Sequence, residues 1–105
     1  MNIERYQIGK ELDSFNYQQV REDILAILEK GSNVVIDMTE CTYISSTGLR
    51  VLLVSKKMAA TKDLKVYLVG ISDEVKDVME VTGFNTFFDI FSTMEECMKE
   101  VKSEE

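Results

Sequence analysis

Three consecutive hydroxyl side chains stand out among the residues that could carry chemistry. Ser45, Ser46 and Thr47 are followed by Gly48 in the stretch YISSTGLR, which runs from residue 43 to residue 50. A serine hydroxyl in such a place can cap a helix, attack a substrate, or accept a phosphoryl group from another protein. The other residues of the chain help to distinguish these roles.

Catalysis by this cluster is not expected, because the chain contains no histidine. The absence removes the usual general base, the commonest zinc ligand and every pairing of a serine or cysteine nucleophile with histidine. The only two cysteines, Cys41 and Cys97, are far apart in the sequence and are expected to be reduced, partly buried thiols. We therefore expect no enzymatic activity, no cofactor and no bound metal.

The elements around the hydroxyl cluster follow an alternating order of strands and helices. Weak alternation over residues 3–8 predicts a first strand, and apolar steps of three and four residues from Tyr17 predict a helix that ends at Gly31. The apolar run NVVIDM, residues 33–38, predicts a strand covered on both faces. After the polar stretch that holds the hydroxyls, a well-buried helix is expected from Thr47 to Ala60.

The second half of the chain repeats this order. The run KVYLVG, which ends at Gly70, predicts another buried strand, and Ser72 is expected to cap a helix that ends at Gly83. The aromatic segment FNTFFDIF, residues 84–91, is expected to be a strand or extended. Ser92 and Glu95 match a capping box that opens a last helix.

This order predicts an α/β fold in a single domain spanning residues 1–105. We expect a mostly parallel sheet of four to five strands with about four helices, largely on one face. The formal net charge of −7 argues against nucleic acid or an anionic membrane surface as the partner, because both require clustered lysine and arginine. The N-terminus lacks a secretory signal and no apolar run is long enough to span a membrane, so we predict a cytoplasmic protein.

Local physics alone leaves two roles open for Ser46. It lies at or next to the start of the helix predicted from Thr47, where unpaired N–H groups and the helix dipole favour negative charge. A phosphate on Ser46 would be stabilised there. A plain capping role, which stabilises a helix by about 1 kcal/mol, also explains one of the three hydroxyls.

A resemblance along nearly the whole chain, from Tyr6 to Val101, adds a more specific expectation. The order GKELD, a helix, VVIDMTECTYISSTGLRVLL and then GISDEV and VTGFNTFFDIF resembles the STAS-domain anti-sigma factor antagonists of bacteria. Their central pattern runs from a strand ending in Asp, through an aromatic and an aliphatic residue, to Asp-Ser-(Ser, Thr or Ala)-Gly-Leu. The matching residues are Asp37, Tyr43, Ile44, Ser46, Thr47, Gly48 and Leu49.

The resemblance implies a protein switch in which this chain catalyses no reaction. The unphosphorylated form would bind an anti-sigma factor that is also a serine kinase and so free a sigma factor. Phosphorylation of Ser46 would end the binding, and a serine phosphatase would reverse it. Ser45 stands where the family often has Asp, which makes Ser45 a minor rival acceptor, and Thr47 is a second minor rival.

The resemblance also implies a partner-binding surface around the acceptor. It comprises Asp13, Tyr43, Ser45, Ser46, Thr47, Gly48 and Arg50. Asp13 matches an acidic loop residue that faces the partner in relatives, although a turn or cap role explains it equally well. Arg50 either reaches the partner or lies in solvent. We expect a monomer or a weak homodimer.

Two other functions remain as alternatives. A STAS domain that acts as a constitutive scaffold or ligand sensor, never phosphorylated, is favoured by the replacement of Asp by Ser45. A nucleotide-binding or hydrolytic protein is disfavoured, because the chain has no phosphate-cradling glycine-rich loop and no catalytic histidine.

Overall fold

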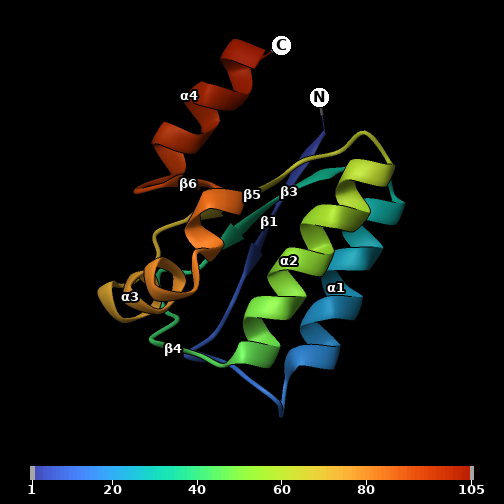
Figure 1. Ribbon diagram of the computed structural model, residues 1–105. Coiled ribbons are helices and arrows are strands. Elements are labelled where there is room, and N and C mark those ends of the chain that lie inside the picture. The colour runs from blue at the N-terminus through green and yellow to red at the C-terminus, as the bar shows by residue number, and fades with distance from the viewer. Residues whose placement is uncertain (1, 105) are drawn as a thin grey trace.

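Four parallel strands form the sheet that organises the chain (Figure 1). The computed structural model describes residues 2–104. The sheet has the order β1-β3-β5-β6, and every neighbouring pair of strands is parallel. The strands are β1 (Ile3–Gln7), β3 (Asn33–Asp37), β5 (Val66–Val69) and β6 (Asp89–Phe91). The predicted α/β fold with a mostly parallel sheet is therefore confirmed.

Three helices cover one face of this sheet and the fourth covers the other. The helices are α1 (Tyr17–Glu29), α2 (Ser46–Thr61), α3 (Asp73–Thr82) and α4 (Met94–Glu104). Buried side chains of α1, α2 and α3 form one core with the first face of the sheet. On the opposite face, Cys97 and Val101 of α4 pack with Val35, Tyr67 and Val69 in a smaller core. The expectation that the helices lie largely on one face holds for three of the four.

The two central strands are buried along their whole length, as their continuous apolar runs predict. Each alternates its side chains between the two cores, with Val34 and Ile36 of β3 in the larger core and Val35 in the smaller. Helices α1 and α2 run side by side and begin at the same end of the molecule (Figure 1). Parallel crossovers produce this arrangement, because each strand enters its helix from the same edge of the sheet.

The C-terminal third of the chain differs from the prediction in two places. The segment predicted as a strand or extended begins with the 3-10 helix η1 (Phe84–Phe87), and only Asp89–Phe91 forms a strand. Gly83, with a φ of 76°, ends α3 in the left-handed conformation and turns the chain into η1. The side-chain cap of α4 lies one residue later than predicted, at Thr93. Thr93 accepts the Glu96 N–H, and the Glu96 carboxylate accepts the Ser92 N–H.

A second, very short parallel sheet joins two loops at the end where α1 and α2 begin. It consists of β2 (Glu11–Leu12) and β4 (Tyr43–Ile44). The Lys10 carbonyl accepts the Thr42 N–H at 2.9 Å, and the Leu12 carbonyl accepts the Ser45 N–H at 3.0 Å. These bonds place the loop before α1 beside the loop before α2. No helix within residues 2–104 has the length and apolar character needed to cross a membrane.

Asp37 ties the edge strand β1 to the loop that leaves β3. Its carboxylate accepts hydrogen bonds from the Arg5 guanidinium at 2.6 and 2.9 Å, and from the Thr39 N–H and hydroxyl at 3.0 and 2.7 Å. Burial alone would raise the pKa of Asp37, but the bonds from Thr39 and Arg5 outweigh it and hold the pKa below its ordinary value. The ionised form of Asp37 therefore stabilises the fold.

We expect Asp37→Asn to lower the free energy of unfolding at pH 7 by about 1–3 kcal/mol. Because the folded-state pKa is lowered, this stabilisation is complete above the ordinary aspartate value of about 3.9 and is lost as the pH falls through the folded-state pKa. Urea unfolding of wild type and variant between pH 7 and pH 3 should show the gap closing at acid pH. Glu4→Gln is the matched control, since its carboxylate forms an exposed pair with Lys30. A constant gap across this range would contradict the assignment.

Candidate functional site

Ser45, not Ser46, caps helix α2. The Ser45 side-chain oxygen accepts the Gly48 N–H at 3.1 Å, and its backbone is extended as an N-cap requires. The helix begins at Ser46, one residue earlier than predicted. The capping role that the sequence left open for Ser46 therefore belongs to Ser45. Ser46 is exposed, and its hydroxyl makes no hydrogen bond to any described residue.

Gly48 lies beneath this first turn and allows α2 to approach β2. A Cβ atom at Gly48 would lie 2.5 Å from the Leu12 carbonyl oxygen and 2.9 Å from an Ile44 side-chain carbon. The resemblance implies that Gly48 belongs to the partner-binding surface. The structure instead shows it buried against β2 and β4, where it positions the hydroxyls and is not itself on the surface.

The segment before Ser45 is anchored by the buried side chain of Cys41. The Cys41 thiol is fully buried and donates a hydrogen bond to the Tyr43 carbonyl at 3.3 Å. Burial raises the pKa of this thiol, so it stays protonated and inert. Two residues later Tyr43 itself is 55% exposed. The loop is therefore fixed from inside while it presents an aromatic ring to solvent.

Asp13 forms the turn that leads into α1. Its carboxylate accepts the Phe15 N–H at 2.9 Å, its own N–H donates to the Asn16 side chain at 2.9 Å, and its carbonyl accepts the Tyr17 N–H at 3.0 Å. The turn role that the sequence leaves open is confirmed. This turn displays Phe15, which is 95% exposed and which the sequence reasoning missed. An aromatic residue inside the polar turn DSFN was the available signal.

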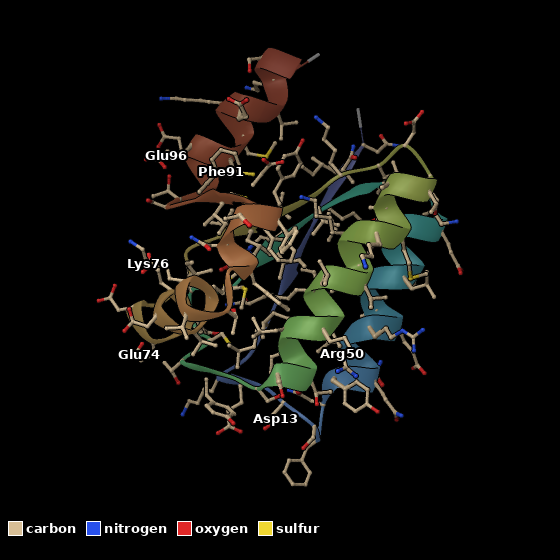
Figure 2. All side chains as sticks on the ribbon, viewed as in Figure 1. Asp13, Arg50, Glu74, Lys76, Phe91 and Glu96 are labelled. Atoms are coloured by element: carbon tan, nitrogen blue, oxygen red, sulfur yellow. The ribbon has the colours of Figure 1, made fainter. Side chains whose placement is uncertain are left out.

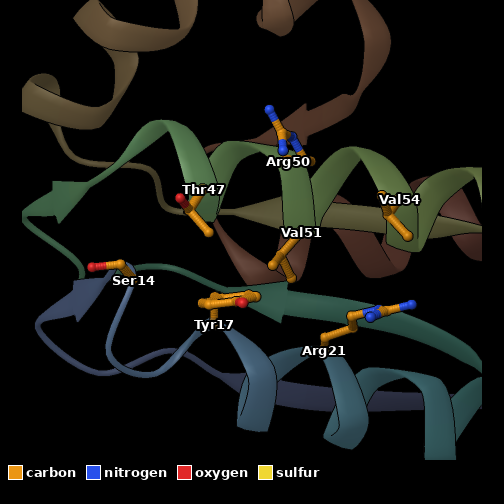
Figure 3. Close-up of a pocket in the computed structure, with 7 residues that line it drawn as sticks. All are labelled: Ser14, Tyr17, Arg21, Thr47, Arg50, Val51 and Val54. Carbon is orange, nitrogen blue, oxygen red and sulfur yellow. The ribbon is translucent and has the colours of Figure 1, made fainter.

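A groove lies between α1 and α2, and Thr47, the residue after Ser46, is one of the residues that line it (Figure 3). Its volume is about 630 Å³. Val51 points from α2 toward Tyr17 on α1 in Figure 3, and Arg21 and Arg50 come from the two helices. The lining residues are Ser14, Tyr17, Arg21, Thr47, Arg50, Val51 and Val54. Thr47 connects the groove to the hydroxyl cluster.

The fold thus gathers most of the predicted partner-binding residues at one end of the molecule. Asp13 and Arg50 lie at this end in Figure 2, where α1 and α2 begin. Pairing of Glu11 with Tyr43 brings the exposed tyrosine to the same end. Among residues 2–104, no group of three or more Cys, Asp or Glu side chains is arranged to hold a metal ion. The site offers an accessible hydroxyl, exposed aromatic rings and two guanidinium groups, which suits recognition by another protein.

Comparison with known proteins identifies relatives of this site and fold. The STAS domain model matches residues 2–97. The BtrV protein of Bordetella bronchiseptica is 32% identical over 85 residues, which cover 80% of this chain and 73% of BtrV. The anti-sigma-B factor antagonist of Staphylococcus aureus is 26% identical over 78 residues, which cover 73% of this chain and 72% of that protein.

Solved structures agree with this match at the level of the fold. Protein TM1081 of Thermotoga maritima superposes with a TM-score of 0.89 at 24% identity, over 95% of this chain and 87% of its own. The anti-sigma factor antagonist SpoIIAA in its unphosphorylated form superposes with a TM-score of 0.72 at 17% identity, over 96% and 90%. Bacillus SpoIIAA in its phosphorylated form gives 0.73 at 18% identity, over 95% and 91%.

Gly48→Ala should destabilise the protein although alanine favours helices, because its methyl group would overlap the Leu12 carbonyl. We expect a loss of about 1–3 kcal/mol in the free energy of unfolding, measured by urea denaturation. Gly9→Ala is the matched control, since nothing lies within 4 Å of a Cβ built there, and it should leave stability unchanged within about 1 kcal/mol. Equal stability of the two variants would show that α2 does not need this close approach.

Proposed function

The chain belongs to the STAS domain family, and from this premise we propose that it is an anti-sigma factor antagonist switched by phosphorylation of Ser46. The unphosphorylated form binds an anti-sigma factor that is a serine kinase, and this binding frees a sigma factor. Phosphorylation of Ser46 ends the binding and a serine phosphatase restores it. The chain catalyses no reaction itself and works in the cytoplasm.

The different hydrogen bonding of Ser45 and Ser46 is the observation that supports this proposal. Ser45 is engaged as the helix cap, whereas the exposed Ser46 hydroxyl is unbonded among the described residues. A kinase can therefore take the Ser46 hydroxyl into its active site without breaking the cap of α2. Ser45 is a poor acceptor for the same reason, because a phosphoryl group there would disturb the bond to the Gly48 N–H.

A phosphate on Ser46 has opposite effects on the free chain and on the complex. In the free chain it sits at the first residue of α2, where the helix dipole and N–H groups without acceptors in the helix stabilise an anion. In the complex the exposed rings of Phe15 and Tyr43 are suited to desolvated contact, and about −1.5 to −2 units of charge beside them cost desolvation energy. The existence of both phosphorylated and unphosphorylated SpoIIAA structures is consistent with such a switch on this fold.

Incubation with the anti-sigma factor kinase that binds this chain, together with ATP, should add one phosphate to the wild type. Mass spectrometry of the intact protein should show no phosphate on Ser46→Ala and one phosphate on Ser45→Ala and Thr47→Ala. Ser45→Ala loses the cap and should be less stable by about 1 kcal/mol, so its melting temperature is recorded in parallel. Phosphate mapped to residue 45 or 47 in the wild type would overturn the assignment of Ser46.

Ser46→Asp should weaken binding of the same kinase at least tenfold while leaving the melting temperature close to that of the wild type. The reason is that residue 46 is exposed and unbonded, so the substitution changes the interface without changing the core. Isothermal titration calorimetry measures the affinity, and Ser46→Asn controls for size without charge. A kinase that binds wild type and Ser46→Asp equally well would favour the constitutive scaffold instead.

A further inference from the structure

The three arginines of the chain are divided unevenly between structure and surface. Arg5 is bound to Asp37 in the sheet. Arg21 and Arg50 form no ion pair or side-chain hydrogen bond with any described residue, and both line the groove between α1 and α2. An arginine held open in this way can bind a carboxylate through two parallel hydrogen bonds.

The groove is cationic although the protein as a whole is acidic. The chain has 19 acidic and 12 basic residues, yet no aspartate or glutamate is among the residues that line the groove. Its apolar part consists of the Tyr17 ring with Val51 and Val54, and Ser14 and Thr47 also line it. The arrangement combines an apolar surface with two unpaired cations, which is complementary to a segment that carries both apolar and acidic side chains.

We propose that this groove binds an acidic, apolar segment of the anti-sigma factor, with carboxylates on Arg21 and Arg50 and apolar side chains on Tyr17, Val51 and Val54. This inference rests on the proposed function only because it takes the partner to be an anti-sigma factor. A second copy of the chain is a poor occupant, because two molecules of charge −7 repel each other. A peptide segment suits this groove, because the groove is open and is lined by residues of two helices.

The same groove connects partner binding to the switch. Ser46 and Arg50 are four residues apart on α2, so they lie one above the other on the helix surface. A phosphate on Ser46 comes within reach of the Arg50 guanidinium and competes for it with the carboxylate of the bound segment. Phosphorylation then releases the partner by withdrawing one of its two cationic contacts as well as by adding charge.

Selection from a random 12-residue peptide library displayed on phage tests the groove without requiring the kinase. Peptides that bind the wild-type chain should be enriched in Asp and Glu flanked by Leu, Ile, Val or Phe. Fluorescence anisotropy with the best peptide should show at least tenfold weaker binding to the double variant Arg21→Gln/Arg50→Gln. The matched control Lys57→Gln/Lys62→Gln removes the same charge from exposed positions of α2 and its C-terminal cap that do not line the groove, and should change the affinity less than threefold.

Four results would overturn the proposal. Enriched peptides without acidic residues would show that the cations are not the recognition element. Equal loss of affinity in the two double variants would show that only net charge matters. A dimer that sedimentation detects and that Arg21→Gln/Arg50→Gln abolishes would assign the groove to a second copy of the chain. Complete displacement of the selected peptide by decanoate, with no effect of a Glu→Gln change in the peptide, would assign the groove to a small organic anion.

The link to phosphorylation is measured with phosphoserine incorporated at position 46 during translation. The modified chain should bind the selected peptide at least fivefold more weakly than wild type, and Arg50→Gln should remove most of that difference. An undiminished difference in Arg50→Gln would refute competition for Arg50. Failure of the kinase to modify Ser46 while the peptide still binds would refute the proposed function alone, and modification of Ser46 without acidic-peptide binding would refute this inference alone.

Discussion

The close approach of α2 to Leu12 determines the geometry of the end of the molecule where α1 and α2 begin. The Leu12 carbonyl accepts the Ser45 N–H, and the same oxygen leaves room only for a hydrogen atom at the α-carbon of Gly48. This contact sets where α2 begins, because Ser45 is held in the extended conformation that a cap requires. It also places the turn of Asp13 and Phe15 beside the first residues of α2, since Leu12 is the residue before that turn.

The packing below the surface supports the proposed role of Ser46, because the exposed hydroxyl takes no part in that packing. Ser45 and Gly48 are engaged with each other, Cys41 is buried under the loop, and Ser46 alone of the two serines has its hydroxyl outside this network among the described residues. A charged group added at Ser46 therefore has little folding energy to disturb and acts mainly on whatever binds the surface. The same end of the molecule carries the exposed rings of Phe15 and Tyr43 and the Arg50 side chain, which has no partner among residues 2–104. Under the proposed function, one phosphate would therefore affect several contacts.

Strands and helices with strong apolar patterns were predictable from the sequence, and those with competing signals were not. Val34 to Ile36 could only form a buried strand, and the apolar stripe from Val20 to Leu28 could only face a core. The aromatic run after Gly83 was ambiguous, because phenylalanine suits both a strand and a 3-10 turn, and the left-handed Gly83 leads the chain into the turn for its first half. The cap of α4 was displaced by one residue because Thr93 and Glu96 have equivalent residue types and the same spacing as Ser92 and Glu95.

By itself, the sequence determined the α/β class, the parallel order of elements, the absence of histidine chemistry and the hydroxyl cluster before a buried helix, because these follow from residue type and local periodicity. Only the tertiary structure decided which serine is the cap, that Gly48 faces inward, and that Arg21 and Arg50 share a groove although they lie on different helices. Those features depend on distances between segments far apart in the chain. Such distances are set when α2 packs against both α1 and β2, and no local pattern in the sequence encodes them.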